Sequence, residues 1–303
     1  MKLIFEILWA VVCASSGFLR GAPDYESPLE TQLMMGSVIK VDETRGYWCH
    51  AESMDPPYQG WINALQISFK TEDEISEWIE APKYICTADR SYVYDGASPD
   101  APRICDIVMG ELVRRAPGKS CSRVKVILPD GRQGWMDEGA VEDFLSWVRG
   151  RKPSPDALEM QAREFLGTTY MWGGNCTKYF DCSGLVRLTY YMNGLLLPRN
   201  ASQMVLLGEE IPCGDMSQWR KGDLLFFGTP AKGSRPMRVG HVAMYLGEGR
   251  IIHSSQVVRI CSLLPEGEDY YEREVIAVRR MLAVAGQEGG PQFLKDCPWY
   301  FKQ

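Results

Sequence analysis

The pattern of hydrophobic and polar positions changes near the middle of this 303-residue chain. Before residue 146, short apolar segments alternate with turn residues, as in 37–41 (SVIKV) and 122–128 (SRVKVIL). Short strands separated by frequent glycine and proline are typical of small β-barrels. Beyond that point, helical and strand-like segments are mixed. The pattern therefore predicts an α+β chain in which small β-barrels precede a mixed domain.

A faint internal repeat divides the β-rich part in two. Met35-Gly36 recurs as Met109-Gly110, and Gln59-Gly60-Trp61 recurs as Gln133-Gly134-Trp135. Both recurrences have an offset of 74 residues (109 − 35 and 135 − 61). A shared offset indicates a duplicated unit. We therefore expect two barrels of similar structure.

The expected domain boundaries follow from these patterns. The barrels are predicted at 1–76 and 77–145, and the mixed domain at 146–284. Residues 143–155 (DFLSWVRGRKPSP) are expected to form a linker, because Pro-Ser-Pro stops regular structure. The tail, 285–303, begins with flexible residues and ends with the apolar CPWYF, which we expect to dock on the protein.

The N-terminal segment MKLIFEILWAVVCASS allows two interpretations. It has a lysine, an apolar stretch and small residues, as a signal peptide does, and residues 1–7 would then belong to a targeting segment or be disordered. Against this, Glu6 interrupts the apolar run. We favour a first β-strand here, because the first barrel needs one. The compartment stays open, with the cytoplasm preferred and export to the periplasm or cell surface the alternative.

The mixed domain contains a predicted helix followed by predicted strands. The helix is expected at 156–167, with Asp156 in its first turn and Gly167 at its end. The strands and the surface loop between them are expected at 224–227 (strand), 229–239 (loop), 241–246 and 250–255 (a hairpin) and 274–281 (last strand).

Composition narrows the possible partners. A net charge of −6 and the lack of a basic run argue against nucleic acid. No segment is apolar enough over sufficient length to span a membrane. The ten cysteines show no CxxC pair, so we expect mostly reduced thiols. Nothing in the sequence calls for a cofactor, and the oligomeric state is not predicted.

One stretch carries a cysteine in a setting that can activate it. Residues 167–184 (GTTYMWGGNCTKYFDCSG) are rich in glycine and polar residues, and apolar residues at helical spacing follow. Cys182 is therefore expected where a loop becomes a helix. Free N–H groups and the positive end of the helix dipole favour the thiolate there. The alternative is a small buried core cysteine, which the polar neighbours argue against.

A nucleophilic cysteine needs a base, and the chain has only three histidines, His50, His241 and His253. The last two flank the predicted hairpin. A three-residue turn centred on Glu248 places residue 243 opposite 253, so His241 and His253 lie on one face of the sheet. One can take the proton of Cys182 while the other orients it. The alternatives are ordinary polar sheet residues, or a zinc site, for which no fourth ligand is nearby.

Three motifs together resemble the NlpC/p60 cysteine peptidases of bacterial cell-wall metabolism. They are YMWGG…DCSGLV, KGDLLFFG and GHVAMYLGEG…IIHSS. The resemblance implies a papain-like domain in which Cys182 is the nucleophile, His241 the base and His253 the residue that orients His241. It also implies that the substrate side is lined by Tyr170, Trp172, Asp181 and Ser183.

The β-rich part resembles bacterial SH3-like (SH3b) domains, and the whole chain is similar to one subgroup. That subgroup carries two such domains before the catalytic one and cleaves the γ-D-glutamyl–diamino acid bond of short peptidoglycan peptides. The resemblance implies stem peptides or muropeptides as partners and a loop of the first barrel, with Tyr58, at the substrate. The alternatives are a wall-binding protein and another amidase or acyl transferase.

The sequence departs from the subgroup where a carboxylate is expected to hold the substrate's free amine. After Arg199 the subgroup usually has an acidic residue and then serine, whereas this chain has Asn200 and Ala201 before Ser202. An acidic residue expected in the first barrel falls on Pro28. A neutral amide in place of a carboxylate loses a charge-assisted hydrogen bond. We therefore expect weakened or rebuilt amine recognition.

Overall fold

The computed structural model describes residues 8–120 and 122–302 of the chain. The chain folds into two compact units. The first comprises the residues up to Gly150 together with the end from Cys297, and the second runs from Arg151 to Asp296. Residues 1–7, on which the targeting interpretation falls, lie outside the described residues, whereas the predicted first strand is present at Leu8–Val12 (β1).

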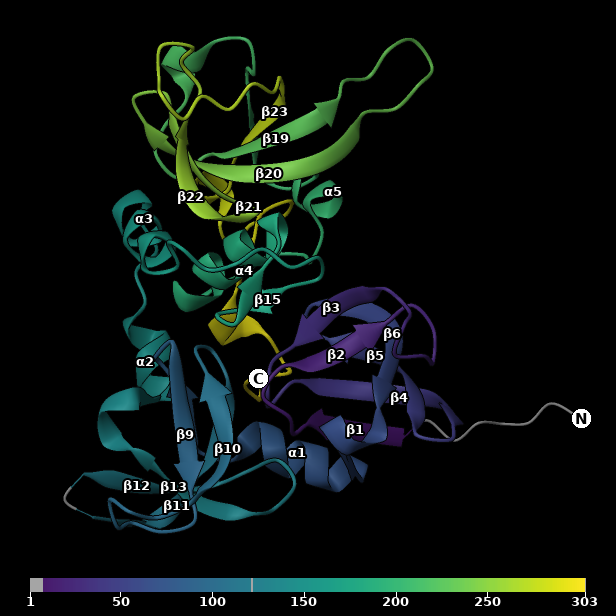
Figure 1. The fold of residues 1–303 in the computed structure, drawn as a ribbon, viewed down its shortest axis with the longest axis vertical. Helices are drawn as coiled ribbons and strands as arrows, with labels where there is room; N and C mark the ends of the chain where they lie inside the picture. The colour runs from purple at the N-terminus through teal and green to yellow at the C-terminus, as the bar shows by residue number, and fades with distance from the viewer. Residues whose placement is uncertain (1–7, 121, 303) are drawn as a thin grey trace, which may run out of the picture. The chain divides into compact units, whose positions relative to one another are not determined.

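The first unit contains two antiparallel seven-stranded sheets with the same strand order (Figure 1). The first runs β3-β2-β6-β5-β4-β1-β7, and the second runs β10-β9-β13-β12-β11-β8-β14, so each strand matches the one seven places later. The strands are β1 Leu8–Val12, β2 Gly17–Arg20, β3 Leu29–Leu33, β4 Val38–Arg45, β5 Trp48–Met54, β6 Pro57–Asn63, β7 Ile67–Lys70, β8 Lys83–Cys86, β9 Arg90–Tyr94, β10 Arg103–Val108, β11 Leu112–Lys119, β12 Arg123–Ile127, β13 Gln133–Asp137 and β14 Val141–Asp143. Each order has two ends, so these SH3-like sheets are not fully closed barrels.

The repeated Gly-Trp motif has one structural role in both sheets. A Cβ on Gly60 would lie 2.9 Å from the backbone oxygen of Arg20, and a Cβ on Gly134 would lie 2.9 Å from that of Tyr94. Only glycine lets the two strands approach so closely at these positions. The duplication predicted from the 74-residue offset is therefore confirmed by the topology.

A helix that the hydrophobic pattern did not predict follows the first sheet. It is α1, Glu72–Glu80, and Thr71 and Glu74 form a capping box at its start. Its buried residues, Ile75 and Trp78, pack with Val11 of the first sheet. The capping residues were a readable signal, since Ser or Thr followed three residues later by Glu marks a helix start.

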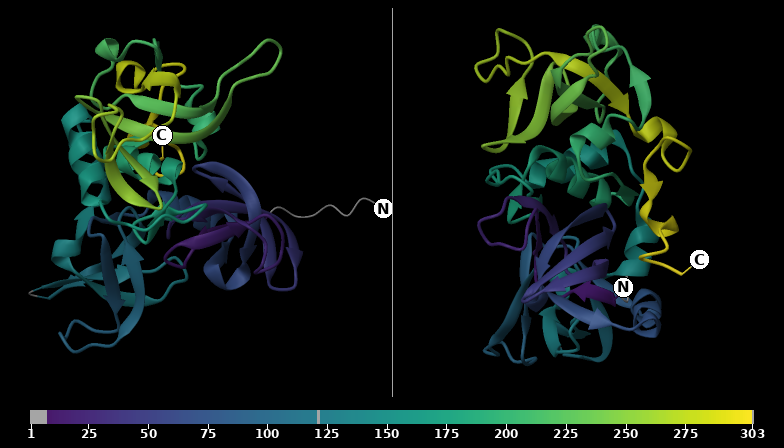
Figure 2. Two further views of the ribbon diagram at one scale, coloured as in Figure 1. Left: turned by 45° about the horizontal axis from the view of Figure 1, so that its top comes forward. Right: turned by 90° about the vertical axis from the view of Figure 1, so that its right-hand side faces the viewer.

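The prediction of a linker at 143–155 is wrong for its first half, which forms α2, Phe144–Gly150. The C-terminal segment packs against this helix. Phe301 stacks on Phe144 with ring centroids 4.9 Å apart, so the end of the chain lies beside α2 (Figure 2). Tyr300 donates a hydrogen bond to Asp55 at 2.7 Å. The expected docking of the aromatic tail is confirmed.

A buried carboxylate ties the two sheets of the first unit together. Glu111 has no exposed surface and accepts hydrogen bonds from three backbone N–H groups. One oxygen receives those of Ser16 and Met35, each at 3.0 Å, and the other receives that of Val108 at 2.9 Å. Because Ser16 and Met35 belong to the first repeat, the carboxylate satisfies donors from both repeats.

Glu111→Gln is expected to lower the free energy of unfolding of the first unit by about 2 kcal/mol. The amide NH₂ that replaces one oxygen would point a donor at a backbone N–H that now donates. Urea unfolding followed by tryptophan fluorescence measures the loss. The control is Glu138→Gln, because Glu138 is half-exposed and pairs with the exposed Lys119, so we expect a change below about 0.5 kcal/mol. Equal losses would contradict the role given to Glu111.

The second unit packs helices against a six-stranded sheet in the order β18-β23-β19-β20-β21-β22. Figure 1 shows α4 running alongside this sheet, with α3 next to it. The helices and the strands of this sheet are α3 Pro155–Glu164, α4 Cys182–Met192, α5 Ala201–Met204, β18 Glu209–Ile211, β19 Leu224–Thr229, β20 Arg238–Gly247, β21 Arg250–Ser255, β22 Val257–Ser262 and β23 Val275–Arg280. Four short strands form two separate pairs: β15 (Asn175–Cys176) pairs with β16 (Tyr179–Phe180), and β17 (Leu195–Leu196) pairs with β24 (Gln292–Phe293).

The predicted elements of this unit are largely present. The helix expected at 156–167 is α3, Pro155–Glu164, and it ends three residues before Gly167. Ser154 is its N-cap, and Asp156 lies in its first turn as predicted. Beyond its turn the hairpin has the predicted register, because Met244 pairs with Ile252, which places residue 243 opposite 253. The three-residue turn is wrong: Gly247 pairs with Arg250, so the turn has two residues, and a bulge between Tyr245 and Gly247 restores the register. The loop between β19 and β20 extends from the sheet as an arm (Figure 2).

Candidate active site

Cys182 is the first residue of α4, and the residues around it fix that turn. The N-cap residue Asp181 accepts a hydrogen bond from the Gly184 N–H at 2.7 Å. A Cβ on Gly184 would lie 2.0 Å from the backbone oxygen of Gly174, a collision with main chain. Glycine is therefore required at 184 for the start of the helix to pack on the loop that precedes it. This arrangement presents Cys182 where the sequence predicted it.

A buried ion pair holds the same turn from behind. Arg199 is 1% exposed and binds both carboxylate oxygens of Asp181, at 3.0 and 2.6 Å. It also donates to Ser183 Oγ at 2.9 Å and to the Gly174 backbone oxygen at 3.3 Å. Such bidentate, charge-assisted contacts restrict geometry strongly. Asp181 and Ser183, which the resemblance places on the substrate side, are both buried and bonded within this network.

The two histidines of the hairpin contact each other. His241 on β20 and His253 on β21 approach with Nε2 of the first 2.9 Å from Nδ1 of the second. Both are buried, with His253 having no exposed surface. Tyr271 packs its ring against both imidazoles, at centroid distances of 5.7 Å from His241 and 4.6 Å from His253. The tyrosine restricts the space in which either ring can turn.

The environment of the histidines favours their neutral forms. Burial is the main cause, and it lowers the pKa of His241 to about 3, with contributions from His253 and Arg273. Burial together with the cations of Arg259 and Arg273 lowers the pKa of His253 to about 4. At neutral pH each ring therefore has one donor and one acceptor nitrogen.

The sulfur of Cys182 lies against the strand that carries His241. The backbone N–H groups of Val242 and Ser183 bond to it, and Val242 follows His241 directly in β20. These amides and Arg199 lower the thiol pKa, but burial and the Asp181 charge outweigh them and raise the pKa of Cys182 to about 11. The expectation that the helix start would favour the thiolate is therefore wrong for the resting site, where the neutral thiol dominates.

Alkylation of Cys182 by iodoacetamide is expected to accelerate roughly tenfold per pH unit between pH 7 and 9. The thiolate reacts, and its fraction rises with pH because the thiol pKa lies above this range. Mass spectrometry of the peptide that contains Cys182 measures the rate. The experiment uses a Cys213→Ser background, because Cys213 is an exposed thiol that would also react with iodoacetamide. A rate that is constant across this range would indicate a preformed thiolate–imidazolium pair and contradict the neutral site.

The remaining predicted site residues differ in their surroundings. Tyr170 is half-buried, and burial and the neighbouring Cys182 raise the pKa of its phenol to about 12. Trp172 is 67% exposed on the same loop. Asn200 and Ser202 lie at the start of the short helix α5, where the Asn200 N–H donates to Gln203 Oε1 at 3.1 Å.

Tyr58 belongs to the first unit, on β6. It donates its hydroxyl to Glu30 Oε2 at 3.2 Å, and it packs on the core of the first sheet. Its role at the substrate stays a prediction.

Sequence reasoning did not assign a role to Arg199, Tyr271 or Cys261, all of which belong to this network. The run Leu197-Pro198-Arg199 was a signal for the first, because an arginine inside an apolar segment must find a buried acceptor. Tyr271 lies in an irregular segment, and Cys261 in a strand of ordinary pattern, so neither was identifiable without the fold.

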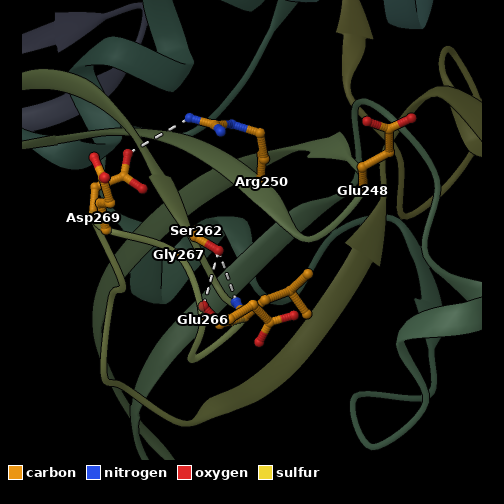
Figure 3. Close-up of a pocket in the computed structure, with 8 residues that line it drawn as sticks. Glu248, Arg250, Ser262, Glu266, Gly267 and Asp269 are labelled. Carbon is orange, nitrogen blue, oxygen red and sulfur yellow. Dashed lines mark hydrogen bonds and ion pairs between the residues drawn. The ribbon is translucent and has the colours of Figure 1, made fainter.

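A hollow of about 730 Å³ lies at the hairpin turn (Figure 3). Half of its eight lining residues are acidic, and Arg250 approaches Asp269 at 3.6 Å. Ser262 also lines it, while the preceding residue, Cys261, contacts His253. Because successive strand residues point to opposite faces, the hollow is on the other side of β22 from the histidines. The lining residues are Glu248, Arg250, Ser262, Leu264, Glu266, Gly267, Glu268 and Asp269.

Further properties concern the described residues alone. Seven cysteines are free thiols: Cys13, Cys49, Cys86, Cys105, Cys182, Cys213 and Cys261. Within 8–120 and 122–302, no group of three His, Cys, Asp or Glu side chains is arranged to hold a metal ion. No helix in this part of the chain combines the length and apolar character needed to cross a membrane.

Comparisons with known proteins agree with this fold. Residues 167–280 match the model of the NlpC/P60 family. A gamma-D-glutamyl-L-lysine dipeptidyl-peptidase of Bacillus cereus is 28% identical, with 84% of this chain aligned to 75% of that protein. Dipeptidyl-peptidase 6 of Lysinibacillus sphaericus is 25% identical, with 81% of this chain aligned to 87% of it. The crystal structure of an NlpC/P60 family protein from Bacillus cereus superposes with a TM-score of 0.75 and 24% identity, covering 90% of this chain and 99% of that one.

A helix that begins with cysteine, packed beside an antiparallel sheet that carries a histidine pair, is the architecture of a papain-like thiol hydrolase. The matching family model and the relatives that align over most of their length identify which class of thiol hydrolase this domain is. Residues 167–280 form an NlpC/P60 cysteine-peptidase domain, and two SH3-like sheets precede it.

Proposed function

We propose that this protein is a cysteine peptidase that hydrolyses the γ-D-glutamyl–diamino acid bond of short peptidoglycan peptides. The names of the relatives from Bacillus cereus and Bacillus subtilis, both gamma-D-glutamyl-L-lysine dipeptidyl-peptidases, support the substrate class. The alignment covers 84% of this chain and so includes the SH3-like part. One observation supports the mechanism most directly. The Cys182 sulfur accepts a hydrogen bond from the backbone N–H of Val242, and the preceding residue, His241, contacts His253.

In this proposal Cys182 is the nucleophile and His241 the base. Nε2 of His241 is occupied by His253, so Nδ1 is the nitrogen that can take the thiol proton. Since thiol and imidazole are both neutral at rest, the proton moves to His241 as the sulfur attacks the γ-carbonyl carbon. His253 keeps the ring of His241 in place and shares the positive charge that develops.

The remaining steps return the site to its starting state. The oxyanion of the tetrahedral intermediate would be stabilised by backbone N–H groups at the start of α4. His241 then donates its proton to the amine of the diamino acid, and the C–N bond breaks to leave a thioester on Cys182. Water, deprotonated by His241, hydrolyses the thioester to the free carboxylate. The two half-reactions together consume one water per amide bond.

Substrate recognition is proposed to be less dependent on a free amino terminus than in the subgroup that this chain resembles. Asn200 stands where that subgroup usually has a carboxylate, and an amide makes a weaker bond to an ammonium group than a carboxylate does. Such a bond to a charged group is worth about 1.5–3 kcal/mol, so the preference for a free amine should fall by roughly tenfold to a hundredfold. This proposal would be wrong if the free peptide were cut faster than the N-acetylated peptide by as large a factor as a carboxylate at position 200 would produce.

The decisive experiment is mass spectrometry of the products from L-Ala-γ-D-Glu-L-Lys and from its meso-diaminopimelate counterpart. Release of L-Ala-D-Glu by the wild type, and not by Cys182→Ala, supports both reaction and nucleophile. Running the N-acetylated peptides in parallel separates bond specificity from amine recognition. If no peptide of either series is cut, the proposed function is wrong, and binding to the cell wall through the SH3-like part becomes the better hypothesis.

A further inference from the structure

The hydrogen-bonded chain at the active site continues beyond the histidine pair. Nε2 of His253 lies 3.3 Å from Sγ of Cys261, while its Nδ1 faces His241. Both nitrogens of this ring are therefore engaged. His253 has no exposed surface and Cys261 is 1% exposed, so bulk water does not compete for either contact.

The sheet register places the sulfur beside the ring. Cys261 on β22 pairs with Ile251 on β21, and His253 is two residues further along that strand. Paired residues share a face of the sheet, and so do residues two apart. Cys261 is thus a diagonal neighbour of His253, and Tyr271 packs edge-on against the same ring, so the imidazole is held from two directions.

The hydrogen on each imidazole nitrogen can be assigned from the chemistry that His241 must perform. A neutral imidazole has one donor and one acceptor nitrogen. For His241 to take the Cys182 proton at Nδ1, its Nε2 must carry a hydrogen and donate it to Nδ1 of His253. His253 then carries its own hydrogen on Nε2. The group that faces Nε2 must therefore accept, and that group is the sulfur of Cys261.

The reverse arrangement would block the base. If the Cys261 thiol donated to Nε2 of His253, that ring would carry its hydrogen on Nδ1 and donate it to His241. His241 would then carry its hydrogen on Nδ1 and could not accept a proton from Cys182. The direction in which the Cys261 thiol hydrogen points therefore decides whether His241 can act as the base.

We propose that Cys261 is a positioning residue for this reaction: its sulfur accepts the Nε2 hydrogen of His253 and thereby sets the tautomers of both histidines. The inference rests on the proposed roles of Cys182, His241 and His253, and it adds a further member to that chain. The charged groups that act on His253, Arg259 from β22 and Arg273 from the segment after it, both disfavour its protonation. A neutral acceptor therefore suits this position.

Nitrogen-15 NMR of the histidine rings tests the assignment without any substrate. The chain has only three histidines, and His50, which bonds Asp42 in the first unit, is an internal reference. We expect wild-type His241 and His253 each to carry the hydrogen on Nε2. In Cys261→Val, which keeps an apolar side chain of similar size but has no acceptor, the two rings should become mixtures of tautomers.

The kinetic consequence is a loss in kcat with KM unchanged. A residue that sets the tautomer of a histidine base contributes strongly to kcat, because the wrong tautomer cannot take the proton. We expect Cys261→Val to lower kcat at least about tenfold on the γ-D-glutamyl peptides. Cys261→Ser supplies a hydroxyl oxygen as the acceptor in place of the sulfur, and its kcat should remain within about twofold of the wild type. Cys49→Ser, at a buried cysteine of the first sheet, controls for the general cost of this substitution.

Two outcomes would overturn the inference. One is a Cys261→Val protein with wild-type tautomers and kcat, and the other is a Cys261→Ser protein that loses as much kcat as Cys261→Val. If Cys261→Val does not fold, Cys261→Ala replaces it in both measurements. Failure of the wild type to cut any peptide would reject the proposed function, whereas the NMR result would still decide the tautomers.

Discussion

Cys182→Ala is expected to lower kcat on the γ-D-glutamyl tripeptides by roughly 10⁴-fold or more, while the protein remains folded. Alanine removes the nucleophile, and residues that act as one catalytic unit lose nearly all their contribution when one is removed. Peptide binding should persist, because binding and catalysis depend on different contacts. Steady-state kinetics with the product dipeptide as readout, together with peptide binding by calorimetry, measures the two effects separately.

The double variant Cys182→Ala/His241→Ala gives the sharper version of this test. If the two residues act as a unit, the second substitution adds almost nothing to the first. Additive losses would show that His241 acts independently of Cys182, for example in substrate binding. His50→Ala is the matched control, since this third histidine lies in the first unit and pairs with Asp42; it should leave kcat within about twofold.

The positions of Cys182, His241 and His253 could be predicted because the local sequence encodes them over short distances. Asp181, Ser183 and Gly184 mark the start of a helix around Cys182, and the short turn of the hairpin limits which residues of β20 and β21 can face each other. The structure has the predicted register, with Met244 opposite Ile252. The histidine–histidine contact at 2.9 Å follows from that register and needs no long-range information.

Other features depend on contacts that the local pattern does not contain. The helix at Phe144–Gly150 was assigned to a linker because its apolar residues only acquire a partner when Phe301, far away in sequence, folds onto them. Asp223 likewise forms a buried bidentate ion pair with Arg280, a residue distant in sequence. The high pKa of Cys182 is also a tertiary effect, because local structure predicts a lower value and burial reverses it.

Arg199→Met is expected to lower the free energy of unfolding of the second unit by about 3–5 kcal/mol, the cost of leaving one partner of a buried ion pair without the other. Asp181 would keep its carboxylate in a buried site after losing two hydrogen bonds at 3.0 and 2.6 Å. Ser183 and the Gly174 carbonyl would lose a donor as well. Calorimetric melting and urea unfolding measure the change.

Arg163→Met is the matched control, because Arg163 forms a half-exposed ion pair with Glu159 on α3 and should cost less than about 0.5 kcal/mol. A second comparison isolates the effect of the Asp181 carboxylate that loses its arginine partner. Adding Asp181→Asn to Arg199→Met removes the buried carboxylate, yet asparagine caps a helix as well as aspartate does. The double variant should therefore regain part of the lost stability while the start of α4 persists. If Arg199→Met behaves like Arg163→Met, or if the double variant is less stable than Arg199→Met alone, the turn that presents Cys182 is held by packing rather than by this ion pair.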